Sequence, residues 1–283
     1  MKVEFMDSQR KQTGPEIEHK YGPNIHILND LELLHNLAIL GMPETKQPDI
    51  DDLIIDCYRV LMNNVINGEF RRKNIEAPTR MIEFEPEKGV YRGPVVDDSQ
   101  HVVCVNLMRA GILPSQVAYH KLTKLLGGDN VTQHHLTIAR KVDSDGQVQG
   151  ADISGLKIDA LPWKDYYALI CDPMGATGGS TVEGLDVYHN KFDTPEKFTK
   201  PKKVIGVCLA ITPEFIHHLR ETYPEFVVYT ARLDRGLSHR VALANTPGSS
   251  GISGNYPERG LNDHQYIVPG LGGVGEIINN TKV

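Results

Sequence analysis

The sequence is poor in the features that mark exported or membrane-spanning proteins. It has four cysteines in 283 residues, and no apolar run approaches the length of about 18 residues that a membrane span needs. Its first residues, MKVEFMDSQRKQTG, contain no apolar segment typical of a signal peptide. We therefore expect a cytoplasmic protein with no membrane partner.

Metal-binding and nucleic-acid-binding patterns are also missing. No CxxC pair occurs, and the histidine pairs 134–135 and 217–218 are adjacent, so their members point to different faces of a helix or strand. We expect reduced core cysteines and no metal ion held directly by protein side chains. The formal net charge of −6 argues against a general nucleic-acid binder.

A glycine-rich loop between an apolar run and a helical segment is the most informative stretch. Residues 166–171, YYALIC, are typical of a buried strand, and residues 180–190 show a helical pattern. The loop between them, DPMGATGG, holds three glycines. Free N–H groups at a helix start lie at the positive end of the helix dipole and bind anions such as phosphate. The order of strand, loop and helix therefore predicts an anion site.

The side chains of this loop limit which kinds of anionic ligand it could bind. Asp172, at the end of the strand, is an acceptor suited to sugar hydroxyls or a hydrated magnesium ion. The loop lacks the lysine of a Walker A motif and does not match the dinucleotide motif GxGxxG. A phosphorylated sugar is favoured, and a glycine-rich turn without a ligand is the alternative.

The rest of the chain repeats the alternation of strand and helix. An apolar run at 101–107 is followed by Arg109 and a helical segment at 114–126, and arginine binds phosphate through a planar fork. A strand at 131–139 ends at Arg140, and residues 142–162, which lack periodicity, are expected to form a flap or hairpin. Further strands are expected at the ranges 204–211 and 226–231, with a helix at 213–223 between them. This alternation predicts an α/β fold with a mostly parallel, twisted sheet and helices on both faces.

Two motifs carry a resemblance to the uracil phosphoribosyltransferases. DPMGATGGST resembles their loop for phosphoribosyl diphosphate (PRPP), DPMLATGGS, and YIVPGLGGVGEIINNT at 266–281 resembles their base-binding stretch, YIVPGLGDAGDRxFGT. NLMRAGILPS around Arg109 and the strand end at Arg140 are weaker matches, and ARLDRGL at 231–237 resembles the stretch before the base loop. The resemblance covers residues 50–283 and implies a type I phosphoribosyltransferase-like fold with a flap, or hood, over the site.

The resemblance also implies a set of site residues and partners. Asp172 and Arg109 are expected to be catalytic, and Ile267, Gly272, Gly273 and Val274 are expected to line the base pocket. The implied small-molecule partners are PRPP, a nucleobase with uracil favoured, Mg²⁺ and, as in some relatives, GTP as an activator. A homodimer or higher homo-oligomer is expected. The residues expected to bind PRPP are Arg109, Arg140, Asp172, Pro173, Met174, Gly175, Ala176, Thr177, Gly178, Gly179 and Ser180.

The chain departs from the family at several of these positions. Gly273 and Glu276 stand where the family has aspartates, and Ile277 stands where it has an arginine. Gly175 replaces a leucine and is expected to remove a bulky neighbour of the ribose and make the loop more flexible. Glu276 is expected either near the site or on the surface.

The chain is expected to divide into two parts. Residues 1–48 form an N-terminal arm and a short apolar segment, and residues 49–283 form the phosphoribosyltransferase-like domain. A Gly/Ser/Pro-rich insertion at 240–262 is expected to be a mobile surface loop near the active site, with a lid or a subunit contact as the alternatives.

Three functions follow from these patterns. The leading hypothesis is an enzyme, a pentosyltransferase that transfers the phosphoribosyl group of PRPP to uracil and gives UMP and diphosphate, as in pyrimidine salvage. The second is the same transfer to another base. The third is a catalytically weak relative that binds PRPP or a nucleotide in a regulatory or structural role, which Gly273 favours.

Overall fold

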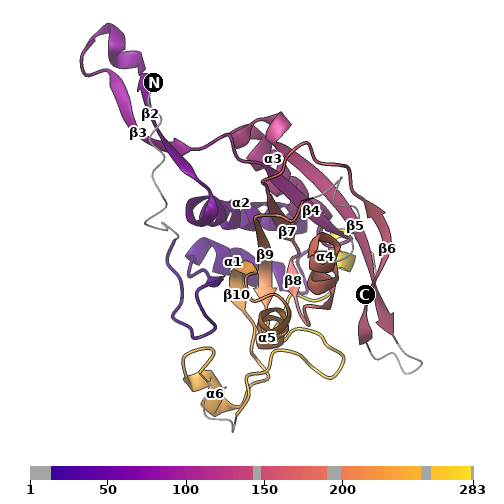
Figure 1. Ribbon diagram of the computed structural model, residues 1–283. Helices are drawn as coiled ribbons and strands as arrows, with labels where there is room; N and C mark the ends of the chain where they lie inside the picture. The colour runs from indigo at the N-terminus through magenta and orange to yellow at the C-terminus, as the bar shows by residue number, and fades with distance from the viewer. Residues whose placement is uncertain (1–13, 143–147, 190–198, 250–255, 282–283) are drawn as a thin grey trace.

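A computed structural model describes residues 14–142, 148–189, 199–249 and 256–281 (Figure 1). Within these residues, no helix has the length and apolarity to cross a membrane. The strands of the main sheet are β1 (Ile25–Ile27), β4 (Val102–Met108), β5 (Val131–Val142), β6 (Val148–Lys157), β7 (Tyr167–Cys171), β8 (Met174–Gly175), β9 (Lys203–Ile211) and β10 (Val227–Leu233). The helices are α1 (Leu31–Leu40), α2 (Asp49–Glu69), α3 (Ile112–Leu126), α4 (Gly179–His189), α5 (Pro213–Thr222), α6 (Arg240–Ala244) and α8 (Val274–Ile278).

The main sheet has the order β1-β10-β9-β7-β4-β5-β6, and the short β8 pairs with β9. All neighbours in it are parallel except β5 and β6, which form an antiparallel pair. The expected mostly parallel sheet is therefore confirmed. β4, β7 and β9 are joined by crossover connections and run in the same direction. Their carboxyl ends therefore lie at the same edge of the sheet.

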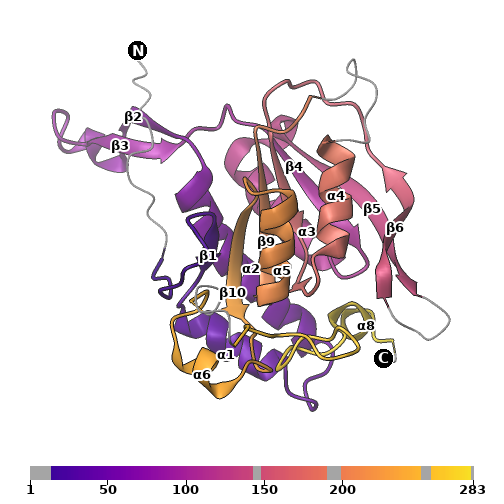
Figure 2. The same cartoon turned by 60° about the horizontal axis from the view of Figure 1, so that its bottom comes forward.

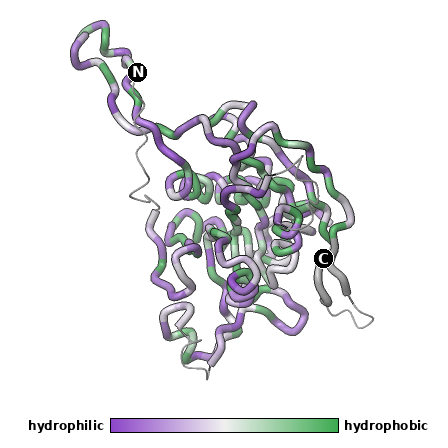
Figure 3. Tube along the Cα trace, viewed as in Figure 1, coloured by the Kyte–Doolittle hydropathy of each residue, from purple (hydrophilic) through white to green (hydrophobic). Residues whose placement is uncertain are grey.

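Helices cover both faces of the sheet (Figure 2). α1, α2 and α3 pack on one face and share a hydrophobic cluster with Cys104, Leu169 and Val207. α4 and α5 pack on the other face, against alternate residues of the same strands such as Val105 and Ile170. Strands that are covered on both faces have continuous apolar sequences, which is why 101–107 and 204–211 show no polar alternation. Figure 3 shows these apolar residues gathered at the centre of the molecule.

Two hairpins extend from this body. β2 (Arg72–Pro78) and β3 (Val90–Val96) form an antiparallel hairpin that projects away from the sheet in both ribbon views. β5 and β6 form the second antiparallel pair, and β6 lies within residues 142–162, where we expect a flap or hairpin; that this segment covers the site stays a prediction. The turn between β5 and β6 and the side chains of residues 139–152 lie outside the described part of the structure.

The segment before α2 contributes to the same core. β1 pairs in parallel with β10, and Leu33 and Leu37 of α1 are fully buried in the cluster that α2 joins. Asp30 caps α1 by accepting a hydrogen bond from the N–H of Leu33 at 3.0 Å. The division of the chain at residue 48 stays a prediction, but residues 25–40 pack as part of the sheet and its helices.

The insertion at 240–262 is anchored where the structure describes it. Its described residues include α6, and the carboxylate of Glu258, 3% exposed, accepts hydrogen bonds from Tyr21 and Arg235 and from the N–H of Gly248 at 2.9 Å. Glu214 of α5 accepts hydrogen bonds from the N–H groups of Gly260 and Leu261. These contacts tie both sides of the insertion to the body, and its mobility stays a prediction.

Candidate active site

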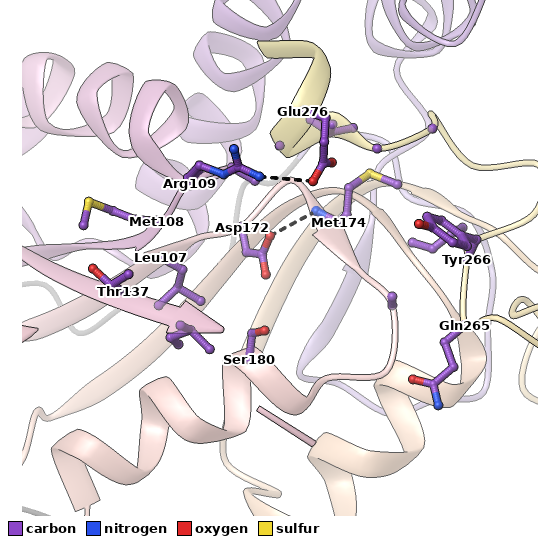
Figure 4. A pocket seen from close by; sticks show the side chains of 18 residues that line it. Leu107, Met108, Arg109, Thr137, Asp172, Met174, Ser180, Gln265, Tyr266 and Glu276 are labelled. Carbon is purple, nitrogen blue, oxygen red and sulfur yellow. Dashed lines mark hydrogen bonds and ion pairs between the residues drawn. The ribbon is translucent and has the colours of Figure 1, made fainter. Parts of the chain in front are cut away.

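A pocket of about 550 Å³ lies at the edge of the sheet where β4 and β7 end (Figure 4). Four chain segments build it: the end of β4 with the turn after it, two residues of β5, the loop after β7, and the C-terminal stretch that leads into α8. Its walls are Leu107, Met108, Arg109, Ala110, Thr137, Ile138, Asp172, Met174, Ala176, Ser180, Gln265, Tyr266, Ile267, Gly272, Gly273, Val274, Gly275 and Glu276.

The loop after β7, residues 172–181, is fixed to the sheet and is called the phosphate loop below. The N–H of Asp172 donates to the carbonyl of Val207 at 3.2 Å, and β8 continues the parallel pairing to β9. Thr212 holds the loop again, because its N–H donates to the carbonyl of Gly175 at 3.1 Å and its hydroxyl to the carbonyl of Ala176 at 2.6 Å. The loop therefore has a fixed path before any ligand binds.

Backbone N–H groups of the phosphate loop are available to an anion. Among the residues that the structure describes, the N–H groups of Thr177, Gly178, Ser180 and Thr181 donate to no acceptor. Gly178 has a φ of +83°, a conformation that favours glycine, and its carbonyl accepts the N–H of Val182 at 2.8 Å. The predicted helix start is thus present, and it offers the donors that bind a phosphate.

We expected position 175 to lie beside the ribose, but the structure turns it away from the sugar site. A Cβ at this position would lie 2.9 Å from Cγ2 of Ile211 and 2.9 Å from Cδ2 of Phe215, both fully buried. The side chain of a larger residue would therefore point into the core on the α5 side. The expected loss of rigidity is not supported, because Phe215 fills the space next to Gly175 and the hydrogen bonds of Thr212 hold the backbone.

Asp172 and Arg109 face the pocket from adjacent strand ends. Oδ1 of Asp172 accepts a hydrogen bond from the N–H of Met174 at 3.3 Å. The neighbouring Cys171 is buried, which raises the pKa of its thiol well above the ordinary value, so this thiol stays protonated. Nη2 of Arg109 lies 3.3 Å from Oε1 of Glu276, and the two side chains are 56% and 36% exposed. Figure 4 shows this pair at the rim above Asp172. Of the two placements expected for Glu276, the structure selects the one at the pocket.

The base-side wall is held by an ion pair at the end of β10, between the partly buried Arg232 and the buried Asp234. Asp234, 1% exposed, accepts the N–H of Gly270 at 3.0 Å and two hydrogen bonds from Arg232 at 2.6 and 2.9 Å. The guanidinium of Arg232 also donates to the carbonyl of Gly270 at 3.0 Å. These bonds fix the turn before Gly272 and join the segment ARLDRGL to the segment YIVPGLGG.

The structure brings most of the expected site residues together. Pro173, Gly175, Thr177, Gly178 and Gly179 belong to the phosphate loop but not to the pocket wall. Arg140 lies in β5 near the site, and its side chain is outside the described residues. The expected residues that line the pocket are Arg109, Asp172, Met174, Ala176, Ser180, Ile267, Gly272, Gly273 and Val274.

Sequence reasoning missed several pocket residues. Thr137 precedes Arg140 on the same strand, and Tyr266 opens the base-binding motif, so neighbouring motif positions could have indicated both. Gln265 has a φ of +62°, which no sequence pattern revealed. Ile277, where the family has an arginine, packs against the apolar cluster of α1, α2 and α3 and brings no charge to the pocket.

The charges of the described pocket wall are two carboxylates, Asp172 and Glu276, and one cation, Arg109. In the described part of the chain, no group of three or more His, Cys, Asp or Glu side chains could hold a metal ion. Mg²⁺ is commonly bound through one or two carboxylates together with substrate phosphates and water. The donor set of this wall therefore fits a magnesium ion that arrives with a phosphorylated ligand.

The sheet order, the phosphate loop and the base-side wall define an α/β protein of the type I phosphoribosyltransferase-like fold. A sequence model of the family described as uracil phosphoribosyltransferase matches residues 27–251, and the chain belongs to this family.

Relatives support this assignment over nearly the whole chain. The uracil phosphoribosyltransferase of Dictyoglomus thermophilum is 27% identical over 248 residues, which cover 88% of this chain and 95% of the relative. That of Polaromonas naphthalenivorans is 24% identical over 261 residues, which cover 92% and 99%. Among solved structures, the AQ2163 protein from Aquifex aeolicus matches with a TM-score of 0.65 at 20% identity, over 92% of this chain and 99% of that chain. At this identity the structural match shows the fold alone.

Proposed function

We propose that the protein transfers the phosphoribosyl group of PRPP to uracil and releases UMP and diphosphate. One observation carries the proposal: the phosphate loop, through Asp172, Met174, Ala176 and Ser180, and the glycine-rich base-side wall line one pocket. A ligand with a phosphate at one end and a flat heterocycle at the other matches this arrangement. Membership of the uracil phosphoribosyltransferase family supports the same reading.

The reaction breaks the bond between the anomeric carbon and a diphosphate oxygen, forms a carbon–nitrogen bond to N1 of uracil, and releases the N1 proton. Its transition state resembles an oxocarbenium ion, so the protein has to position two reactants and stabilise charge on the leaving group. The chemistry needs no nucleophilic side chain.

Each pocket residue then has a role. Asp172 accepts hydrogen bonds from the ribose hydroxyls, and the N–H groups of Thr177, Gly178, Ser180 and Thr181 bind the 5-phosphate. Arg109 binds the diphosphate, and we assign the same role to Arg140. Asp172 and Glu276, the carboxylates of the described pocket wall, would hold a Mg²⁺ ion, which would supply neutralisation of charge on the diphosphate.

The base would be read by the backbone around Gly272 and Gly273. Gly272 has a φ of +76° and open space at its Cβ position, so a planar ring can approach the chain closely. Ile267 and Val274 add apolar walls. A second function, binding of PRPP without efficient transfer, is favoured by two facts: Gly273 offers no carboxylate, and Arg109 forms an ion pair with Glu276.

A product-resolved assay tests the proposal. The purified protein is incubated with PRPP, Mg²⁺ and, in separate reactions, uracil, cytosine, hypoxanthine and orotate. UMP from uracil alone supports the leading function, and a nucleotide from another base changes the acceptor. No product with any base, together with measurable PRPP binding, supports the regulatory or structural role. Mass measurement in solution with and without GTP tests the proposed homo-oligomer and activator.

A further inference from the structure

A histidine outside the sequence motifs holds the backbone of the phosphate loop. His218 lies on α5, which begins at Pro213, and its Nδ1 is 2.8 Å from the carbonyl oxygen of Thr177. A carbonyl only accepts, so Nδ1 carries a proton and donates it, whether the ring is neutral or charged. The ring also packs on the loop, because a Cβ at Gly178 would lie 3.2 Å from Nδ1.

This hydrogen bond orients the peptide unit between Thr177 and Gly178. The C=O and N–H of a trans peptide unit lie in one plane and point in opposite directions. Since the carbonyl of Thr177 points to His218 on α5, the N–H of Gly178 points away from α5. This N–H is one of the donors without an acceptor in the described chain.

The same bond keeps a second donor available. In a regular helix the N–H of Thr181 would donate to the carbonyl four residues earlier, that of Thr177. The structure shows no such bond, and α4 begins at Gly179 with the N–H of Val182 bonded to the carbonyl of Gly178. The bond to His218 turns the carbonyl of Thr177 toward α5, and Gly178, with its φ of +83°, takes the backbone off the helical path, so the N–H of Thr181 keeps no acceptor in the described chain.

α5 is well placed to perform this task. Thr212, at its N-cap, accepts the N–H of Phe215 at 3.0 Å and bonds the loop at Gly175 and Ala176. His218 adds a contact further along the same helix. The helix therefore holds the phosphate loop at two points: Thr212 bonds Gly175 and Ala176, and His218 bonds Thr177.

We propose that His218 is a positioning residue that fixes the peptide unit 177–178 so that the phosphate loop presents its N–H groups to a sugar 5-phosphate. The proposal rests on the proposed function for the identity of the ligand. The hydrogen bond and its effect on Thr181 are independent of that function.

The test compares three variants with the wild type. His218→Ala removes the donor, and His218→Asn restores one, since the amide nitrogen of asparagine lies near the position of Nδ1. His217→Ala is the matched control, because His217 is the adjacent residue on the same helix and its exposed ring faces Tyr21 instead. Affinity is measured with ribose 5-phosphate as the probe, and KM for PRPP and kcat are measured separately.

Loss of one oriented hydrogen bond should weaken ribose 5-phosphate binding and raise KM for PRPP about fivefold in His218→Ala, with kcat changed less. His218→Asn should recover most of the affinity, and His217→Ala should match the wild type. Equal affinity of His218→Ala and the control would overturn the proposal, as would a loss of affinity that His218→Asn does not recover.

Amide hydrogen exchange separates this proposal from the proposed function. In His218→Ala the peptide unit 177–178 loses its anchor and can rotate, which lets the carbonyl of Thr177 reach the N–H of Thr181 and should slow the exchange of that N–H relative to the wild type. Unchanged exchange at Thr181 refutes the positioning role even if the enzyme binds PRPP. If the wild type binds neither ribose 5-phosphate nor PRPP, the proposed function fails, and slowed exchange at Thr181 in the variant still supports the role of His218.

Discussion

Replacing Gly175 with leucine, the residue of the family motif, should damage this protein. Carbon atoms pack at about 3.5 to 4.0 Å, but the first carbon of any side chain here would already lie 2.9 Å from both Ile211 and Phe215. Those neighbours are 0% and 1% exposed and have little room to move. The substitution should also displace the phosphate loop, because Gly175 pairs with Ile211 in the sheet.

The expected loss in the free energy of unfolding follows from overpacking of the core. Inserting carbon atoms into a well-packed core costs about 1–3 kcal/mol, and Gly175→Leu should lie at the upper end because its Cβ already clashes. Phe215→Ala alone removes a buried ring and should cost about 3–5 kcal/mol. In the double variant the leucine enters the space that the ring leaves, so the combined loss should be about 1–3 kcal/mol smaller than the sum of the single losses.

Denaturant unfolding of the wild type, both single variants and the double variant measures these free energies, with m-values compared to exclude a change in the unfolded state. Gly128→Leu serves as the control, because a Cβ there meets no atom within 4 Å, and it should change stability by less than about 0.5 kcal/mol. PRPP affinity is measured on the same proteins. A Gly175→Leu protein as stable as the wild type, or strictly additive losses, would refute the argument that Phe215 fills the place of the family's leucine.

Three further predictions concern the pocket and the core. Asp172→Asn should lower kcat/KM about 10- to 100-fold, because a charged acceptor of ribose hydroxyls is lost, and steady-state kinetics close to the wild type would remove the assigned role. Gly273→Asp, which restores the family's carboxylate, should raise PRPP affinity or turnover in the same assay; an unchanged or lower value would mean that this wall has been rebuilt for another ligand. Burial lowers the pKa of His134 from 6.5 to about 4, so between these pH values the unfolded chain binds a proton that the folded protein does not. Stability should therefore fall by about 2 kcal/mol from pH 7.5 to pH 5 through this residue, and urea unfolding of His134→Gln should lack that part of the pH dependence, whereas identical pH profiles would contradict the assignment.

Local patterns were sufficient where chemistry depends on neighbouring residues. The apolar run 166–171, the aspartate after it and the glycines of the loop are close in sequence, and the structure places them as strand, strand end and helix start. The alternation of strands and helices from 101 to 231 likewise predicted a mostly parallel sheet, because each crossover unit is local.

Contacts between distant residues could not be predicted in this way. Arg109 and Glu276 are 167 positions apart, and nothing in either motif indicates that they form an ion pair. The same holds for His218 and Thr177, 41 positions apart, and for the packing of Phe215 against Gly175. Sequence periodicity shows which side of an element is buried, but not which residue of another element lies against it.

The sequence by itself therefore determined the α/β fold, the family and the phosphate loop, because these depend on short-range periodicity, turn chemistry and contiguous motifs. Tertiary structure decided how the loop is held, which carboxylate meets Arg109 and where a side chain at position 175 would point. Those features depend on packing between elements that are far apart in the chain, and packing is set only when the helices and strands take their places around the sheet.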